Sequence, residues 1–230
     1  MNKAIIKARS IARRIGLKRL YYRLAPRHSY EEKFHNEISA QLRQGDLVWD
    51  VGANVGFYTK LFAQRAGSTG RVFAFEPVPA TYEELCRQTR DYPWVKNEQI
   101  ALSDIDGSSR MVVGKSDTVG HLERFVGEAT TGTSIEVPVM RGDSYWATSG
   151  ITPNVLKIDV EGFEEEVLAG MKSLLAAPEL RAVFLEVHFA ILESRGRSDA
   201  PLRIEKLLRD NGLIPNWVDG SHIVAKRRHV

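Results

Sequence analysis

The stretch Asp50-Val51-Gly52-Ala53-Asn54-Val55-Gly56 decides the fold class of this chain. It overlaps the end of residues 46–51, Asp-Leu-Val-Trp-Asp-Val, which predict a short buried strand, and it precedes a helical pattern at residues 57–66. Glycine lets the backbone bend without a Cβ clash and lets a ligand come close. The stretch therefore predicts a tight, ligand-binding turn between a strand and a helix.

Strand-like and helix-like segments alternate along the rest of the chain. Residues 114–133 are rich in Gly, Ser and Thr and lack periodicity, so we expect a long loop there that can serve as a lid. The alternation predicts an α/β domain with a doubly wound, mostly parallel sheet. The other expected strands are residues 71–75, 95–102, 109–113, 134–140, 155–159, 181–187, 213–218 and 221–226, and the other expected helices are residues 80–91, 161–175 and 200–211.

The composition favours one compact domain with a short extension. The chain has 230 residues, of which 43% are hydrophobic, enough for a sizeable core. The sequence has no run of about 18 apolar residues that would span a membrane and no apolar leader at its start. Its single cysteine, Cys86, excludes an intramolecular disulfide. We therefore expect a cytoplasmic protein with a basic helical extension at residues 1–38 and the main domain at residues 39–230.

Positive charge is concentrated at the start of the chain. Residues 1–28 carry nine Lys and Arg and no Asp or Glu, whereas the whole chain has a net charge of +3. Apolar residues recur among them at helical spacing. Two interpretations stay open. The segment is either a helix that covers the domain or joins two copies in a homodimer, or a helix that lies on anionic lipid at the cytoplasmic face.

The glycine turn lacks the features of a dinucleotide site. The dinucleotide fingerprint needs a second glycine where the pyrophosphate passes, and Asn54 stands at that position. Asp50, at the end of the strand, would repel a phosphate. S-adenosylmethionine carries a sulfonium, an ammonium and a carboxylate but no phosphate, so it fits the turn better. We expect N–H groups of the turn and the helix start to hold its carboxylate.

A carboxylate also follows the second expected strand. Glu76 comes 20 residues after Gly56. At the end of that strand it can accept hydrogen bonds from both ribose hydroxyls, as the acidic residue of dinucleotide folds does. Pro77 and Val78 would then line the adenine.

Several segments, taken together and in order, resemble the FkbM family of methyltransferases over roughly residues 40–190. The resemblance implies a class I methyltransferase (Rossmann-like) fold, with a seven-stranded sheet and an antiparallel closing strand. It also implies S-adenosylmethionine as methyl donor and a hydroxyl of a sugar, glycoside or other small natural product as acceptor. The matching segments are Asp50 to Thr59, Phe73 to Pro77, Ala101 to Asp104, Leu156 to Gly162 and Leu185 to His188.

The same resemblance implies a set of cofactor contacts. Two further contacts, Pro77 and Asp159, are expected because each lies at the end of a predicted strand beside the cofactor. The residues that the resemblance itself implies are Asp50, Gly52, Asn54, Gly56, Tyr58 and Glu76, with Ser103 and Asp104 near the adenine.

Ionisable residues at two further strand ends form the expected acceptor site. Lys157 and Asp159 lie two apart in one strand, and Glu186 and His188 lie two apart at the end of the next, so each pair shares a face. An alcohol needs a base, a metal or tight positioning before it reacts. We expect His188 to be the general base, with Glu186 and Asp159 beside it. A structural, hydrogen-bonded histidine and a Glu186–Lys157 ion pair are the alternatives.

A metal is a second interpretation of this corner. Asp159, Glu186 and His188 offer oxygen and nitrogen ligands that suit Mg²⁺, which would bind a hydroxyl and lower its pKa. Glu161, at the start of the next expected helix, can share the same corner.

Other functions make different demands on the sequence. A nucleic-acid methyltransferase needs a basic stripe with aromatic residues for stacking, whereas here the basic residues cluster at one end. We therefore expect no nucleic-acid partner and keep that activity as an alternative. A non-catalytic nucleotide-binding protein is a further alternative, which the dense polar corner disfavours.

Overall fold

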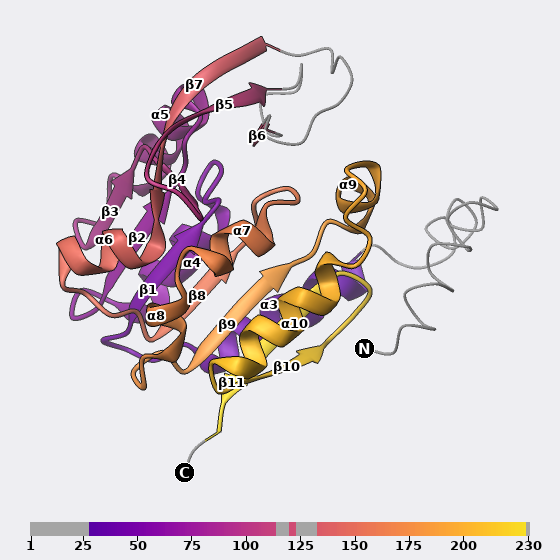
Figure 1. Ribbon diagram of the computed structural model, residues 1–230. Coiled ribbons are helices and arrows are strands. Elements are labelled where there is room, and N and C mark those ends of the chain that lie inside the picture. Colours follow the sequence, from indigo (N-terminus) through magenta and orange to yellow (C-terminus); the bar gives the residue numbers. More distant parts are fainter. Residues whose placement is uncertain (1–27, 114–119, 123–132, 229–230) are drawn as a thin grey trace.

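The computed structural model describes residues 28–113, 120–122 and 133–228, and its backbone folds around a central sheet (Figure 1). Except for one strand, the neighbouring strands run parallel; β11 is antiparallel to both β9 and β10. This confirms the expected seven-stranded, mostly parallel sheet with an antiparallel closing strand. In spatial order the strands are β10 (Leu213–Trp217), β11 (His222–Arg227), β9 (Ala182–Glu186), β8 (Val155–Ile158), β1 (Leu47–Val51), β2 (Arg71–Phe75) and β3 (Val95–Glu98).

Helices cover both faces of this sheet, as a doubly wound fold requires. One face packs against α6, α7, α8 and α10, and the other against α3 and α4. Large apolar residues alternate between the faces, so that Trp49 points to the first and Val48 to the second. The helices are α3 (His28–Gln41), α4 (Phe57–Ala66), α5 (Pro79–Thr89), α6 (Gly142–Ser149), α7 (Glu164–Ala169), α8 (Lys172–Ala176), α9 (Phe189–Ser194) and α10 (Ala200–Asp210).

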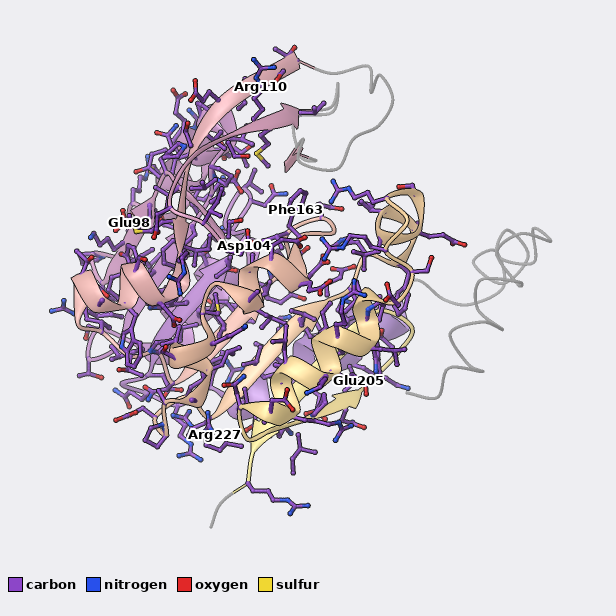
Figure 2. All side chains as sticks on the ribbon, in the orientation of Figure 1. Glu98, Asp104, Arg110, Phe163, Glu205 and Arg227 are labelled. Carbon is purple, nitrogen blue, oxygen red and sulfur yellow. The ribbon has the colours of Figure 1, made fainter. Side chains whose placement is uncertain are left out.

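A second, smaller sheet lies beyond the carboxyl ends of the central strands. Its strands, in spatial order, are β4 (Ala101–Ser103), β7 (Thr133–Arg141), β5 (Gly107–Val113) and β6 (Gly120–Leu122). Phe163, which Figure 2 labels, packs in one cluster with Met111 and Val139 of this sheet. The second sheet therefore covers the edge at which the central strands end.

Three sequence expectations about the elements were wrong. The single strand expected at 95–102 is two strands, β3 and β4, which belong to different sheets. The loop expected at 114–133 contains β6, and its other residues, 114–119 and 123–132, lie outside the described residues. The helix expected at 161–175 begins only at Glu164, because Glu161 and Gly162 have φ angles of +50° and +88°, which no α-helix permits.

Helix α3 packs onto the sheet by its apolar residues. Phe34 is 2% exposed and Ile38 is 0% exposed, and both join the cluster that contains Phe184. Most of the basic segment at residues 1–28 lies outside the described residues, so the boundary at residue 38 stays a prediction. Among the helices that the structure describes, none combines the length and the apolar character needed to cross a membrane.

Candidate functional site

The glycine turn after β1 is fixed by its own hydrogen bonds. The N–H groups of Gly52 and Ala53 both donate to the carbonyl of Phe75, at 3.0 Å each. Gly52 has a φ of +79°, and a Cβ there would stand 1.8 Å from the carbonyl oxygen of Asp159. Only glycine fits at this position, because β1 and the end of β8 approach so closely there.

The other N–H groups of the turn are also used within the protein. Asn54 N–H donates to Glu76 Oε2, Val55 N–H to Asn54 Oδ1, and Gly56 N–H to the carbonyl of Ala53. We expected N–H groups of the turn and of the helix start to hold a ligand carboxylate. Since the N–H groups of the turn are used within the protein, this expectation now rests on those at the start of α4.

Glu76 is a buried carboxylate at the end of β2. Its side chain accepts the N–H of Asn54 at Oε2 (3.0 Å) and the N–H of Val78 at Oε1 (2.9 Å), and the residue is 7% exposed. Burial raises the pKa of Glu76 to about 7, although both hydrogen bonds lower it. The two bonds fix the carboxylate at the wall of the cleft described next.

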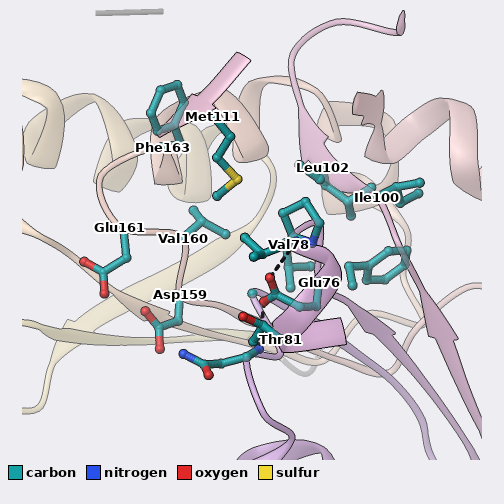
Figure 3. Close-up of a pocket in the computed structure, with 16 residues that line it drawn as sticks. Glu76, Val78, Thr81, Ile100, Leu102, Met111, Asp159, Val160, Glu161 and Phe163 are labelled. Atoms are coloured by element: carbon teal, nitrogen blue, oxygen red, sulfur yellow. Dashed lines mark hydrogen bonds between the residues drawn. The ribbon is translucent and has the colours of Figure 1, made fainter. Parts of the chain in front are cut away.

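A cleft opens between the central sheet and the second sheet (Figure 3). It encloses about 750 Å³ of space, counting the open solvent at its mouth. Figure 3 shows Asp159 and Glu161 on one side and Ile100 and Leu102 on the other. The lining residues are Val51, Gly52, Asn54, Phe75, Glu76, Pro77, Val78, Thr81, Ile100, Ala101, Leu102, Met111, Asp159, Val160, Glu161 and Phe163.

Half of the expected cofactor residues lie in this lining and half lie behind it. Gly52, Asn54, Glu76, Pro77 and Asp159 line the cleft. Behind the lining, Gly56 precedes α4 with a φ of +90°, and Ser103 Oγ donates to Asp104 Oδ1 at 3.2 Å. The remaining two residues, Asp50 and Tyr58, surround a buried lysine.

That lysine, Lys157, forms a buried ion pair beneath the strand ends. Its Nζ lies 3.3 Å from Asp50 Oδ1 and 3.5 Å from Asp159 Oδ2, and 5.0 Å above the ring of Tyr58. Asp50 also accepts a hydrogen bond from Thr59 Oγ1 at 2.7 Å. Burial alone would lower the pKa of Lys157, but the two aspartates raise it above its ordinary value.

The expected acceptor corner does come together, around His188. Nε2 lies 3.2 Å from Glu161 Oε2, 3.7 Å from Asp159 Oδ1 and 3.9 Å from Glu186 Oε1. Nδ1 lies 2.7 Å from Glu164 Oε1. Burial lowers the pKa of His188, but the carboxylates outweigh it and raise the value to about 9.

Glu186 pairs with a histidine rather than with Lys157, the partner that the sequence offered. His222 and Glu186 are register partners on β11 and β9, and Glu186 Oε2 lies 3.5 Å from His222 Nε2. Asp219 Oδ2 lies 2.7 Å from the other ring nitrogen of His222. Burial lowers the pKa of His222, but both carboxylates raise it, to about 9.

Sequence reasoning missed Glu164 and His222. The sequence pattern marks Glu164 only as a favourable acid in a first helical turn, yet it is 0% exposed and contacts His188. No pattern in the sequence indicates this contact, because Glu161 and Gly162 adopt positive φ angles before the helix begins. His222 had no signal in the sequence, because its contact with Glu186 follows from strand pairing.

Comparisons with known proteins find related methyltransferases. Residues 50–214 match the family model described as the methyltransferase FkbM domain. The hexuronic acid methyltransferase AglP of Haloferax volcanii is 29% identical over 153 residues, which cover 66% of this chain and 59% of that protein. The 31-O-demethyl-FK506 methyltransferase FkbM of Streptomyces tacrolimicus is 31% identical over 191 residues, covering 70% of this chain and 73% of that protein.

Two solved structures share the fold. A methyltransferase FkbM from Methylobacillus flagellatus has a TM-score of 0.51 at 14% identity, covering 78% of this chain and 43% of its own. A putative rRNA-methylase from Clostridium thermocellum has a TM-score of 0.56 at 12% identity, covering 90% of this chain and all of its own. The fold is the Rossmann-like, class I methyltransferase fold that the sequence resemblance implied. With the family model matched over most of its length, the chain belongs to the FkbM methyltransferase family.

Proposed function

We propose that this protein transfers a methyl group from S-adenosylmethionine to a hydroxyl of a sugar, glycoside or other small natural product. The observation that carries the proposal is the position of Glu76, a buried carboxylate on the wall of a cleft that Asp159 and Glu161, the neighbours of His188, also line. The names of the relatives support a small-molecule acceptor, since they point to a hexuronic acid and to 31-O-demethyl-FK506.

The residues of the cleft suit the chemical parts of S-adenosylmethionine. Glu76 has the placement to accept hydrogen bonds from ribose hydroxyls. Val78 and Leu102 offer apolar surface to the adenine, and the carboxylate of Asp159 is placed to attract the ammonium or sulfonium. The cofactor would supply an electrophilic methyl group next to the acceptor corner.

Methyl transfer to a hydroxyl forms a C–O bond to the acceptor and breaks the C–S bond of the sulfonium. The electron pair of the broken bond returns to sulfur, and the hydroxyl proton leaves to a base. We propose that Asp159, Glu186 and His188 bind and orient the acceptor. With a pKa near 9, only about one His188 in a hundred is neutral at pH 7. If His188 itself takes the proton, turnover therefore rises with pH up to about 9.

The test combines binding and turnover. Calorimetry should show binding of S-adenosylmethionine and S-adenosylhomocysteine, while NAD should leave the melting temperature unchanged. Methyl-labelled cofactor should then label a member of a panel of sugars, uronic acids and glycosides, and leave RNA oligonucleotides unlabelled. Absence of binding of both sulfur nucleosides at millimolar concentration would overturn the proposal, and labelled RNA would replace its acceptor class.

A further inference from the structure

Three side chains at the edge of the cleft, two of which line it, bring potential metal ligands together. One ligand atom each from Asp159, Glu161 and His188 lie within 4.8 Å of one another. Nε2 of His188 is 3.2 Å from Glu161 Oε2 and 3.7 Å from Asp159 Oδ1. Two carboxylate oxygens and an imidazole nitrogen are a suitable ligand set for Mg²⁺ or Mn²⁺. Asp159 and Glu161 also line the cleft, so a metal ion bound to them would lie where it can contact the acceptor.

A second observation comes from the other side of the ring. Glu164, which is 0% exposed, places Oε1 2.7 Å from His188 Nδ1, and the same oxygen accepts the N–H of Gly162 at 2.8 Å. Its other oxygen, Oε2, is buried without a hydrogen-bond partner. Metal-binding histidines commonly donate their second N–H to a carboxylate in this way, which fixes the ring and directs the other nitrogen at the ion. Glu164 is thus placed to orient His188 toward the cleft.

The charges around the ring also leave room for a cation. Oxygens of Asp159, Glu161, Glu164 and Glu186 all lie within 3.9 Å of a ring nitrogen of His188. A single imidazolium balances at most one of these four carboxylates, while Glu186 is paired with His222 and Arg195 interacts with Glu161 and Glu164. Lys157 serves Asp159 but is shared with Asp50.

From these contacts we propose that Asp159, Glu161 and His188 bind a divalent cation of the Mg²⁺ or Mn²⁺ class, with Glu164 as the residue that positions His188. The sequence suggested Glu186 in place of Glu161. The structure favours Glu161, because Glu186 lies farther from Nε2 and its second oxygen faces His222. The role of the ion rests on the proposed function: it would bind the acceptor hydroxyl and favour loss of its proton.

The test measures metal binding itself, without turnover. Full-length protein is titrated with Mn²⁺ alone, and bound Mn²⁺ is followed by electron paramagnetic resonance, with Mg²⁺ as competitor. We expect one Mn²⁺ per chain and at least tenfold weaker binding in Asp159→Asn and in Glu161→Gln. Glu164→Gln should weaken binding roughly 10- to 100-fold, although Glu164 does not touch the ion. The matched control is Asp210→Asn, an exposed acid on α10 that pairs with Lys206 and should bind Mn²⁺ as wild type does.

The outcomes separate this inference from the proposed function. Wild-type protein that binds S-adenosylmethionine but no Mn²⁺ at millimolar concentration overturns the metal site and leaves the methyltransferase proposal standing. Protein that binds Mn²⁺ but neither S-adenosylmethionine nor S-adenosylhomocysteine overturns the methyltransferase proposal and leaves the metal site standing. Equal Mn²⁺ affinity in wild type, Glu161→Gln and Glu164→Gln also overturns the site. Circular dichroism of each variant identifies any that fails to fold. Asp159→Asn and Glu161→Gln, whose side chains are each 28% exposed, are less subject to that failure than Glu164→Gln, whose side chain is 0% exposed.

Discussion

Lys157 Nζ lies 3.3 Å from Asp50 Oδ1, and the two side chains are only 3% and 0% exposed. Replacing one member of such a pair leaves the other charge buried without its partner. Lys157→Met should therefore lower the free energy of unfolding by about 3–5 kcal/mol. The control is Lys96→Met, which breaks a 2.7 Å pair with Glu98 in which the lysine is 64% exposed, and should cost less than about 1 kcal/mol. Urea denaturation measures both, and equal losses would contradict the assignment of a buried pair.

The raised pKa of Glu76 makes cofactor binding depend on pH. Ribose hydroxyls donate to a carboxylate, so binding favours the ionised form, and the free protein holds the proton below a pKa of about 7. Affinity for S-adenosylhomocysteine should therefore rise about tenfold between pH 6 and pH 8 and then level off. In Glu76→Gln the affinity should be lower and nearly constant over that range, as measured by calorimetry. A wild-type affinity that is flat in pH would remove Glu76 from the ribose site.

His222 should make the protein less stable at alkaline pH. Its pKa is about 9 in the folded protein and about 6.5 when unfolded, so the folded state holds the proton more tightly. The resulting stabilisation is complete below pH 6.5 and is lost as pH rises through 9, up to about 3 kcal/mol. His222→Phe retains a ring to stack on Phe34 and should reduce the slope of unfolding free energy against pH, leaving the share of His188, whose pKa is also about 9. A variant curve parallel to wild type between pH 6.5 and 9 would refute the pairing with Asp219 and Glu186.

A position can require glycine because of a positive φ angle or because a Cβ would clash with a neighbour. Comparison of Gly52 with Gly150 distinguishes these two causes. Both have positive φ angles, +79° and +66°, but a Cβ at Gly52 would strike the carbonyl of Asp159, whereas Gly150 has open space around it. Gly150→Ala should cost about 1–2 kcal/mol from the backbone conformation alone. Gly52→Ala should cost clearly more and also weaken cofactor binding, because the turn must move away from β8. Thermal unfolding and calorimetry of the two variants compare these effects directly.

Deletion of residues 1–28 tests the predictions about the basic segment. The fold and the cofactor affinity should survive, because the sheet motifs begin later. Extending the deletion through Gln41 removes Phe34 and Ile38 from the core and should destabilise the domain by several kcal/mol. Loss of liposome binding in the shorter deletion would support the lipid interpretation, and a monomer replacing a dimer would support self-association. Unfolding of the shorter deletion would contradict both.

The central sheet could be predicted from the sequence because its signals are local. Buried strands such as β2, residues 71–75, are short apolar runs bounded by glycine or proline, and parallel strands place their last residues at one edge. That rule is enough to predict, from the sequence alone, that Asp159, Glu186 and His188 lie close together.

The parts that sequence reasoning missed depend on contacts between distant segments. Helix α7 starts late because Glu161 and Gly162 adopt positive φ angles. The helical stretch is interrupted again at Gly170, between α7 and α8, where a Cβ would stand 1.8 Å from the carbonyl oxygen of Ser103. Neither constraint has a periodic signature in the sequence. The separation of β4 from β3 has none either, because the chain passes from one sheet to the other within residues 95–102, which the sequence predicts as a single strand.

All strands of the second sheet come from one continuous segment of the chain, between Glu98 at the end of β3 and Val155 at the start of β8. Its hydrogen-bond ladders are its own, and within the described residues they do not enter the pairing of the seven central strands. It nevertheless supplies Leu102 and Met111 to the lining of the cleft, which Asp159 also lines. An insertion or replacement in this segment would reshape one wall of the cleft and leave Glu76 and the glycine turn in place, because they follow β2 and β1 of the central sheet. The cleft wall that this piece of chain supplies can therefore change in shape while the seven central strands keep their pairing.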